Sequence, residues 1–402
     1  MTVGILANTY PPNLNGVSIT TARLVESLRE KGIKVVVAVP RTKGTTYPDY
    51  ILALKSIPLP KKMRADIQIP FLWKDEVIEF FKDQGVDIIH SHDTFFGGLE
   101  ATQIAKELDI PCVHTYHTYI EAYRSIDIPG YKPFIREFSK MVCNHYEHVI
   151  ALSSKIYLYL KELPIKSPIS QFLNVTSLQH LNPIPFDAKF AARYGIDSHD
   201  FCIITFGRVS KEKGLFTALE VIEPLLKTHR NAKYIIAGQG SYVKKLLKKA
   251  EKLGIADQVI IPGKYTPENL SKWCSIAKFF LFTSVTENLP TTLLEAMYSG
   301  LPVVTIDDDS VDYIVKHRVN GYKAPLEKLS QFCGDLYSHP DLLSQLSHEA
   351  ILSAKEVEKR DVTQEYIDLY KQIIDQFESK AKKKGFIEKY IDNQMAKLMN
   401  NS

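Results

Sequence analysis

Two glutamates flank a turn in the segment FTSVTENLPTTLLEAMYSGLPVV, residues 282–304. Glu287 precedes a helix-forming run at 291–299, and Glu295 lies within that run. A helix that begins where a strand ends offers free N–H groups and a positive dipole end, which suit a phosphate. Carboxylates repel phosphate, so we interpret the two glutamates as groups for sugar and ribose hydroxyls. The alternative is an ordinary surface glutamate in a turn and another in a helix.

The elements around these glutamates follow from the same segment. Pro290 is expected at the first helical position, where its missing N–H costs nothing, and Gly300 is expected to end the helix. Strands at 278–283 and 302–306 flank the helix. This is a strand–turn–helix–strand unit of an open α/β sheet, in which ligands bind outside the strand ends.

A pair of basic residues follows another expected strand, in FGRVSKEKG at 206–214. Arg208 and Lys213 lie across a turn; arginine offers a fork to phosphate oxygens and lysine a compact charge. Negative charge develops on a diphosphate as its bond breaks, so such a pair would stabilise the transition state. Alone, the motif is compatible with an ordinary charged turn. Beside Glu287 and Glu295 it favours a sugar-nucleotide site.

Two glycines follow expected strands, and one of them, Gly16, could let a ligand approach the backbone closely. Gly16 opens a helix after a strand at 3–7, and Gly238 lies in GQG after a strand at 233–237. A glycine at a helix mouth leaves room for a nucleotide-type ligand, although it could also serve the turn alone. The GxGxxG fingerprint of dinucleotide-binding proteins is absent.

Two groups of residues could hold a metal. Four histidines gather near strand ends: His90, His92, His114 and His117. No cysteine or carboxylate joins them at the usual spacing of zinc ligands. Asp307 and Asp309 in DDDS, at 307–310, have an Asp-x-Asp spacing, which we interpret as a solvated loop. We therefore expect no metal and no other cofactor.

The expected strands and helices alternate along the chain, which predicts parallel α/β sheets with right-handed crossovers. The first half is expected to contain strands at 3–7, 34–39, 86–90, 111–116 and 148–152, irregular chain at 41–70 and a helix at 132–146. After a linker at about 180–198, strands are expected at 201–206, 233–237, 258–261, 278–283 and 302–306. The end of the chain is expected to be helical at 326–337, 340–356 and 361–378.

The composition is that of an ordinary globular protein, with 402 residues, 45% hydrophobic and 24% charged, enough for two or three domains. No apolar run reaches the ~20 residues that span a bilayer, and the start MTVGILANTY lacks the features of a signal peptide. The five cysteines are scattered without a CxxC pair, which indicates reduced thiols in a cytosolic protein. The net charge of +4 is mild. No nucleic-acid-binding motif is present, so no nucleic-acid partner is expected.

The motifs occur in an order that resembles retaining GT-B glycosyltransferases of family 4, over about residues 3–380. They are Gly16, the HxH at 90–92, His117, GRVSKEKG, GQG, ENLPTTLLEA and the VNG at 319–321. The resemblance implies an α/β protein with two Rossmann-like domains facing across a cleft and a C-terminal helix crossing back. On this basis we expect a first domain at 1–184, a second at 185–360, a crossover helix at 361–378 and a basic tail at 379–402.

The resemblance also implies roles for individual residues. Catalytic roles fall on His117, Glu287, Arg208 and Lys213, and donor-binding roles on Gly16, Gly238, Leu289, Thr291 and Glu295. Glu287 would touch the donor sugar, Glu295 the nucleotide ribose, and His117 would lie close to the sugar and the diphosphate. The family pattern is a front-side reaction, in which the departing diphosphate oxygen helps to deprotonate the acceptor, and it needs no metal.

The sequence departs from the family pattern at two places. Pro290 stands where relatives usually carry glycine, so the N–H donors for phosphate would come from Leu289, Thr291 and Gly16. The usual proline-asparagine-glycine stretch is absent around 174–187, which leaves the hinge geometry open.

The acceptor is inferred from the stretch VHTYHTYIEAY at 113–123, which resembles bacterial diacylglycerol glucosyltransferases. The resemblance implies UDP-glucose as donor, a membrane glycerolipid such as diacylglycerol as acceptor, and Glu121 and Tyr123 as acceptor residues. The residues themselves name neither base, sugar nor linkage.

Basic and apolar residues of the first half favour a peripheral place on an anionic cytoplasmic membrane face. The basic residues are Lys61, Lys62, Arg64, Lys132, Arg136 and Lys140, and each can contribute about 1 kcal/mol near an anionic surface. The helix at 132–146 adds an apolar side with Phe134, Ile135, Phe138, Met141 and Val142, although that side could simply pack on the domain core. Lys382–Lys384 could add a second contact.

Other readings remain open. The acceptor could be a polysaccharide, a soluble sugar or a protein. The chain could also be a non-catalytic sugar-nucleotide-binding protein or a GT-B sugar-nucleotide epimerase, which would give product without an acceptor.

Overall fold

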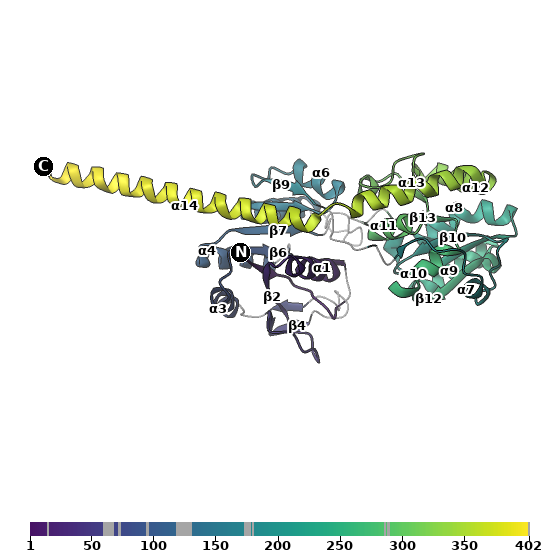
Figure 1. Ribbon diagram of the computed structural model, residues 1–402, viewed down its shortest axis with the longest axis horizontal. Helices are drawn as coiled ribbons and strands as arrows, with labels where there is room; N and C mark the ends of the chain where they lie inside the picture. The colour runs from purple at the N-terminus through teal and green to yellow at the C-terminus, as the bar shows by residue number, and fades with distance from the viewer. Residues whose placement is uncertain are drawn as a thin grey trace. The chain divides into compact units, whose positions relative to one another are not determined.

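A computed structural model describes residues 1–13, 16–58, 68–70, 74–93, 96–117, 131–172, 178, 181–284, 287 and 290–400 (Figure 1). The chain divides into two compact units. Unit 1 contains Met1–Leu152, Ile156–Val175 and Asp361–Ser402, and unit 2 contains Ser153–Lys155 and Thr176–Arg360. The end of the chain therefore belongs to the same unit as its beginning.

Unit 1 is built on a parallel sheet that has seven strands in the described part of the chain. In spatial order they are β3 (Ile51–Leu54), β2 (Lys34–Pro40), β1 (Thr2–Leu6), β6 (Ile88–Ser91), β7 (Cys112–Tyr116), β8 (His148–Ala151) and β9 (Ile169–Gln171). The helices are α1 (Gly16–Glu30), α3 (Lys74–Gln84), α4 (Phe96–Leu108), α5 (Tyr131–Cys143), α6 (Ser154–Glu162) and α14 (Val362–Asn400). A separate antiparallel pair joins β4 (Ser56–Pro58) to β5 (Gln68–Pro70).

Unit 2 repeats this plan with a parallel sheet of six described strands. Their order is β12 (Val259–Gly263), β11 (Ala232–Ala237), β10 (Phe201–Phe206), β13 (Phe279–Phe282), β14 (Val303–Ile306) and β15 (Gly321–Ala324). Its helices are α7 (Ala188–Ala192), α8 (Leu215–Thr228), α9 (Val243–Leu253), α10 (Pro267–Ser275), α11 (Thr291–Tyr298), α12 (Leu326–Ser338) and α13 (Pro340–Glu358). Short 3-10 helices are η3 (Lys211–Lys213), η4 (Ala256–Gln258) and η5 (Asp309–Val311). Figure 1 shows the helices of this unit on both faces of its sheet.

The strands are buried on both faces, which explains their nearly unbroken apolar sequences. Along β13, Phe279 and Leu281 pack in one apolar cluster of unit 2, whereas Phe280 and Phe282 pack in the cluster on the opposite face. Side chains of a strand alternate between the two faces of the sheet, so four consecutive large residues fasten both helix layers. The alternating strands and helices predicted from sequence are confirmed.

The helix α14 joins the end of the chain to unit 1. Tyr366 and Tyr370 are buried, and the hydroxyl of Tyr370 lies 2.6 Å from Nδ1 of His90 in β6. At the surface, Lys31 at the end of α1 pairs with Asp361. The first turns of α14 are therefore part of the core of unit 1, while its distal part extends beyond the body of that unit (Figure 1).

Two expectations about the elements are wrong. The stretch 41–70 is not wholly irregular, because β3 pairs with β2 in parallel and β4 pairs with β5. The strand β3 is too short to show a pattern, and β4 and β5 have three residues each and end in proline. The last helix does not end at 378 but continues to Asn400. The lysines and alanines of the expected basic tail are good helix formers.

Among the described residues, no helix combines the length and the apolar character needed to cross a membrane.

Buried histidines predict that unit 1 is the acid-sensitive part of the molecule. Burial, as the largest cause, lowers the pKa of each of five histidines in unit 1 below its usual value, to about 4 for His114 and His148 and about 3 for His117; the list is His90, His92, His114, His117 and His148. A neutral buried histidine stabilises the fold above its unfolded pKa of about 6.5, and this stability is lost as the pH falls from there toward the folded pKa. Each contributes a slope of up to about 1.4 kcal/mol per pH unit. Calorimetry between pH 7 and about 4.5 should show the transition of unit 1 falling steeply.

Unit 2 supplies the internal control, because none of its described histidines is buried. Its transition should move less over the same pH range. A His148→Gln variant should lower the slope of unit 1 by roughly one histidine equivalent. Equal acid sensitivity of the two transitions would contradict the prediction.

Candidate active site

Both sheets reverse their direction of strand addition at one point, between β1 and β6 in unit 1 and between β10 and β13 in unit 2. Ligands of open α/β sheets bind outside the carboxyl ends of strands at such points. The residues predicted from sequence follow these four strands: Gly16 after β1, His92 after β6, Arg208 and Lys213 after β10, and Glu287 after β13. The topology therefore places the candidate residues at the expected edge of each sheet.

Close backbone contacts hold the loops of unit 2 together at three glycines. A Cβ atom would lie 1.9 Å from the Gly207 oxygen at Gly238, 2.1 Å from the Val209 oxygen at Gly240, and 2.3 Å from the Thr283 oxygen at Gly214. Gly214 also has φ of 66°, a left-handed conformation that side chains disfavour. These positions therefore require glycine, and the loops after β10, β11 and β13 form one packed layer.

An ion pair links two of these loops. Lys213 Nζ lies 2.5 Å from Glu287 Oε1, and the two side chains are only 25% and 19% exposed. Ser284 Oγ lies 3.1 Å from the same oxygen and can donate to it. Removing either charge would leave the other poorly compensated in a half-buried place. Lys213 and Glu287 are thus held as one unit at the end of β10 and β13.

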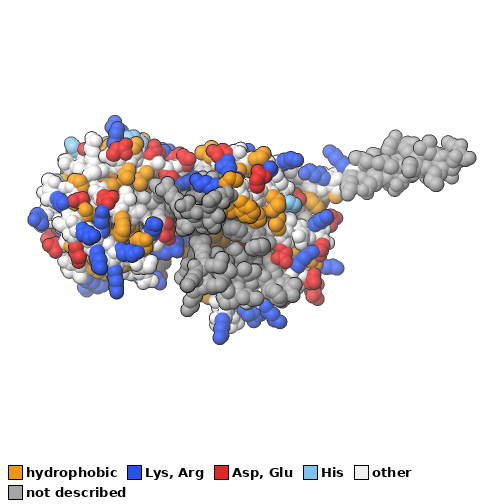
Figure 2. Space-filling model, turned by 180° about the vertical axis from the view of Figure 1, so that it is seen from behind, with side chains coloured by type: hydrophobic (Ala, Val, Ile, Leu, Met, Phe, Trp, Pro, Cys, Tyr) orange, Lys and Arg blue, Asp and Glu red, His pale blue; other side chains and the backbone are white. Residues whose placement is uncertain are grey.

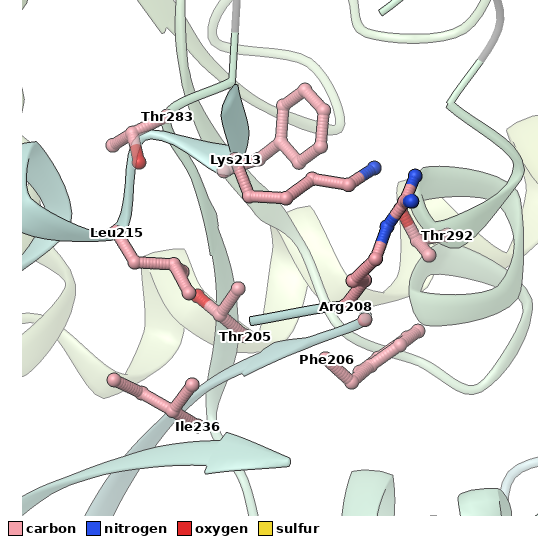
Figure 3. A pocket seen from close by; sticks show the side chains of 10 residues that line it. Thr205, Phe206, Arg208, Lys213, Leu215, Ile236, Thr283 and Thr292 are labelled. Atoms are coloured by element: carbon pink, nitrogen blue, oxygen red, sulfur yellow. The ribbon is translucent and has the colours of Figure 1, made fainter. Parts of the chain in front are cut away.

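Arg208 completes a pocket with Lys213. Both residues line it together with Thr292 of α11, and Figure 3 shows their charged ends extending to the side on which Thr292 lies. The Arg208 side chain is 67% exposed, and its Nε lies 3.9 Å from Glu212 Oε1. Two cations beside the start of a helix can bind the oxygens of a phosphate or a diphosphate.

The start of α11 differs by one residue from the expectation. Pro290 is the N-cap and the helix begins at Thr291, so Pro290 is not at the first helical position. The Pro290 oxygen accepts a hydrogen bond from the Tyr313 hydroxyl at 3.1 Å. The first N–H groups of a helix have no partner within it, and here Thr291 supplies the first one because proline has none. Gly300 ends the helix with φ of 90°, as predicted.

The second glutamate lies near two half-buried tyrosines, Tyr265 and Tyr313. Glu295 is half-buried in α11. Burial raises the pKa of Tyr313, and the carboxylates of Glu295 and Glu287 raise it further. Burial and Glu295 likewise raise the pKa of Tyr265. The charges of both glutamates therefore act on the Tyr313 hydroxyl.

Gly16 in unit 1 differs from the glycines of unit 2. It is the first residue of α1, and a Cβ atom there would meet nothing within 4 Å among the described residues. The packing of the described residues therefore gives no steric reason for glycine at this position. Glycine at this position would instead leave room for a ligand at the start of the helix.

The four histidines are close together but already engaged with protein groups. His90 Nδ1 lies 2.6 Å from the Tyr370 hydroxyl and Nε2 lies 2.7 Å from Thr115 Oγ1. His114 Nδ1 lies 3.1 Å from the Ser91 oxygen, and its ring stacks on Tyr146. His90 therefore anchors α14, and His114 belongs to the core of unit 1.

His92 and His117 form a pair. His92 Nδ1 lies 2.8 Å from His117 Nε2, so one proton is shared between these two nitrogens. Burial, with His114 as a smaller cause, lowers the pKa of His117 to about 3, so its ring is neutral near pH 7. His117 can therefore offer a hydrogen bond but no positive charge. His92 Nε2 is buried and has no hydrogen-bond partner among the described residues.

Neither candidate metal group is assembled in the described part of the chain, where no three or more histidine, cysteine, aspartate or glutamate side chains converge for a metal ion. The aspartate loop after β14 is tied down by lysines instead. Lys155 Nζ lies 2.8 Å from Asp308 Oδ2, and Lys323 Nζ lies 3.2 Å from Asp307 Oδ1. Asp308 is only 15% exposed, so the interpretation of the loop as simply solvated does not hold for this residue.

Three predicted site residues, Leu289, Glu121 and Tyr123, lie outside the described residues, as do Lys61, Lys62 and Arg64. The sequence reading missed Ser284, Thr292 and Tyr313. Ser284 and Thr292 are small polar residues without a distinctive spacing. Tyr313 follows the aspartate loop and meets the glutamates only through the fold.

The comparisons with known proteins identify the family and the fold. Residues 14–175 match the model described as Glycosyltransferase Family 4, and residues 187–330 match the model described as Glycosyl transferases group 1. A sucrose-phosphate synthase structure from Thermosynechococcus elongatus has a TM-score of 0.76 at 16% identity, over 94% of this chain and 100% of that one. Two Rossmann-like units together with this structural likeness define the GT-B fold. The chain belongs to the glycosyltransferases whose two halves are of family 4 and group 1.

Two curated relatives cover almost the whole chain. An alpha-monoglucosyldiacylglycerol synthase of Streptococcus pneumoniae is 26% identical, over 92% of this chain and 86% of that protein. A protein of the same name from Acholeplasma laidlawii is 25% identical, over 96% of this chain and 100% of that protein.

The different surroundings of Gly238 and Gly16 predict different effects when each is replaced by alanine. Gly238→Ala should destabilise unit 2 by about 3 kcal/mol, because the new methyl group overlaps a backbone oxygen. Gly16→Ala should leave the melting temperature unchanged and lower the affinity for a nucleotide sugar about tenfold, because one methyl group then keeps the ligand off the backbone. Thermal melts and calorimetric titration measure the two effects. Unchanged nucleotide-sugar affinity in a folded Gly16→Ala variant would remove Gly16 from the site.

Proposed function

We propose that the protein is a retaining glycosyltransferase that moves glucose from UDP-glucose to a hydroxyl of a membrane glycerolipid such as diacylglycerol. The observation that carries the proposal is the Lys213–Glu287 pair beside Arg208 at the carboxyl ends of β10 and β13. The lipid acceptor is supported by the two relatives, both named as alpha-monoglucosyldiacylglycerol synthases, which align with nearly the whole chain.

The Lys213–Glu287 pair places a cation and a carboxylate side by side. A sugar nucleotide needs both, a cation for its diphosphate and a carboxylate for its hydroxyls. In the proposal Lys213 and Arg208 hold the diphosphate, Glu287 takes the sugar hydroxyls, and Glu295 takes the ribose. When the donor enters, diphosphate oxygens replace part of the contact between Lys213 and Glu287, and the glutamate turns its hydrogen-bonding capacity to the sugar. Positive charge already held in place needs no reorganisation as the diphosphate leaves.

The chemical step is a front-side substitution at the anomeric carbon. The bond from this carbon to the β-phosphate oxygen breaks, and the bond to the acceptor oxygen forms on the same face. The acceptor proton moves to the departing diphosphate oxygen, so atoms and charge balance without a protein nucleophile. The two cations stabilise the charge that grows on the diphosphate, and the loops supply orientation. No metal takes part in this proposal.

His117 supports the proposal as a neutral hydrogen-bonding group. The family resemblance assigns it to the donor sugar and the diphosphate. Its lowered pKa means that it would orient a hydroxyl or a phosphate oxygen rather than neutralise charge. The positive charge that stabilises the departing diphosphate would then come from Arg208 and Lys213.

The helix α5 supports a contact with the membrane. Its inner side, with Ile135 and Val142, is buried. Phe134 and Met141 lie on an outer side and are 65% and 43% exposed, and the Phe134 ring stacks on Phe138. Apolar side chains are visible on the surface of unit 1 in Figure 2. An outer apolar row on a helix with a buried inner side suits a bilayer interface.

The charged residues of the pocket give one prediction. Arg208→Ala and Lys213→Ala should each lower the transfer rate about a hundredfold or more, since each removes a preorganised cation. Lys227→Ala, at an exposed ion pair of α8, is the matched control and should transfer at the wild-type rate. Wild-type rates in both pocket variants would refute the diphosphate assignment.

The reaction should also survive EDTA, because the two cations supply the positive charge. Loss of activity with EDTA that Mn²⁺ or Mg²⁺ restores would instead indicate a metal-dependent reaction.

The two glutamates should separate by kinetic effect. Glu287→Gln should lower kcat while leaving UDP affinity largely intact, because it removes a carboxylate proposed for the reacting sugar. Glu295→Ala should mainly weaken UDP binding. Steady-state kinetics and titration with UDP distinguish the two, and an equal loss of UDP affinity would contradict the division of roles.

The acceptor is tested with radiolabelled UDP-glucose and vesicles that contain diacylglycerol. Labelled glycolipid is expected, and a Phe134→Gln, Met141→Gln double variant should bind vesicles about tenfold more weakly. The matched control is Leu326→Gln, Leu352→Gln in unit 2, which removes two similarly exposed apolar side chains. Label found only in a water-soluble acceptor, or in free sugar, would end the lipid hypothesis. Binding of UDP-glucose without any product would indicate a sensor.

A further inference from the structure

We propose that α9 of unit 2 is a second docking surface of this protein, with an anionic lipid bilayer as its partner. This helix is remote in sequence from α5, and none of its residues lines the pocket of Arg208 and Lys213. The inference rests on the proposed function only for the statement that a membrane is present during the reaction.

The net charge of α9 differs strongly from that of the rest of the chain. Its sequence, VKKLLKKAEKL, has five lysines and one glutamate and therefore a net charge of +4. The whole chain of 402 residues also has a net charge of +4. The remaining residues are therefore balanced, and the entire excess of positive charge equals that of this eleven-residue helix.

The lysines form a row on the outer side of the helix. With 3.6 residues per turn, Lys244, Lys248 and Lys252 follow one another at successive turns. They lie opposite Leu246 and Ala250, which are buried. The three lysines are exposed. The inner side of α9 thus fastens the helix to unit 2, and the outer side presents charge.

The row is only partly compensated within the described residues, where Glu251, the one acidic residue of α9, lies at its edge. Lys249, at the flank, pairs with Glu220 of α8 at 2.6 Å, and Lys245 lies 4.5 Å from the centre of the Tyr242 ring. The three lysines of the row have no ion pair within the described residues. Like charges four residues apart destabilise a helix, and Lys244 stands in the first turn, where the helix dipole also disfavours a cation. Binding of an anionic partner would offset this unfavourable electrostatic energy.

Apolar side chains on both flanks of the row indicate a bilayer rather than a soluble polyanion. Leu247 is 41% exposed on one flank. On the other flank Phe216 is 37% exposed, with its ring 5.7 Å from Tyr242. Lysines attract an anionic surface from a distance, and neighbouring apolar groups enter the headgroup boundary once contact is made. A nucleic acid or an acidic polysaccharide would use the lysines but leave Leu247 in water.

The test compares two triple variants of the full chain with equal charge change. Lys244→Gln, Lys248→Gln, Lys252→Gln removes the row. Lys189→Gln, Lys328→Gln, Lys355→Gln removes three exposed lysines elsewhere on unit 2. Partition onto phosphatidylcholine vesicles, with and without phosphatidylglycerol, is measured at about 0.1 M salt, where the screening length is about 10 Å.

The row variant should partition onto anionic vesicles about a hundredfold more weakly than wild type, because each lysine near such a surface contributes roughly a fivefold change. The control variant should lose less than about threefold. The melting temperature of the row variant should stay the same or rise, since like-charge repulsion is relieved. Both variants should retain wild-type hydrolysis of UDP-glucose or transfer to a detergent-dispersed acceptor.

The outcomes separate this inference from the proposed function. Equal losses in the two variants, or wild-type partition of the row variant, would overturn the docking role of α9. Binding of wild type to RNA or heparin but not to anionic vesicles would overturn it in favour of a polyanion. If α9 governs vesicle binding but no variant, wild type included, labels a lipid, the proposed acceptor fails and the docking surface stands.

Discussion

The backbone contact between three loops is the constraint on which the site of unit 2 depends. Gly238, Gly240 and Gly214 bring the loops after β10, β11 and β13 closer than any side chain would allow. This contact sets the distance between η3, which carries Lys213, and the turn that carries Glu287. The 2.5 Å ion pair is therefore a consequence of glycine placement. Preorganised charge of this kind is what phosphate-leaving chemistry requires.

In unit 1, hydrogen bonds between buried polar groups, and not close backbone contacts at glycines, hold the histidines in place. His90 is completely buried and both of its ring nitrogens are used, one by Tyr370 of α14 and one by Thr115 of β7. The ring of His90 lies against that of His92, which in turn holds His117. A neutral network can be packed this tightly because neutral imidazole avoids the cost of burying charge. The same choice makes the unit sensitive to acid.

The sequence was sufficient for the fold class, most elements and the order of the motifs, because apolar runs and turn residues act locally. It was insufficient where pairing depends on distance in space. Nothing in the spacing of Lys213 and Glu287 shows that they touch, nor that the charges of Glu287 and Glu295 raise the pKa of Tyr313. The HxH motif named two histidines together, yet His90 anchors a helix while His92 pairs with His117. Short strands such as β3 were missed because four residues show no period.

The placement of positive charge follows two different physical rules in this chain. At the site, Lys213 is only 25% exposed and has a carboxylate beside it, so its charge is strong, local and directed at a small ligand. On α9 the lysines are exposed and in a row, so each is weak alone and screened by salt. Many weak charges acting together suit a surface much larger than the protein. A mild net charge of +4 hides this distinction, since it averages over a site that is balanced and a helix that is not.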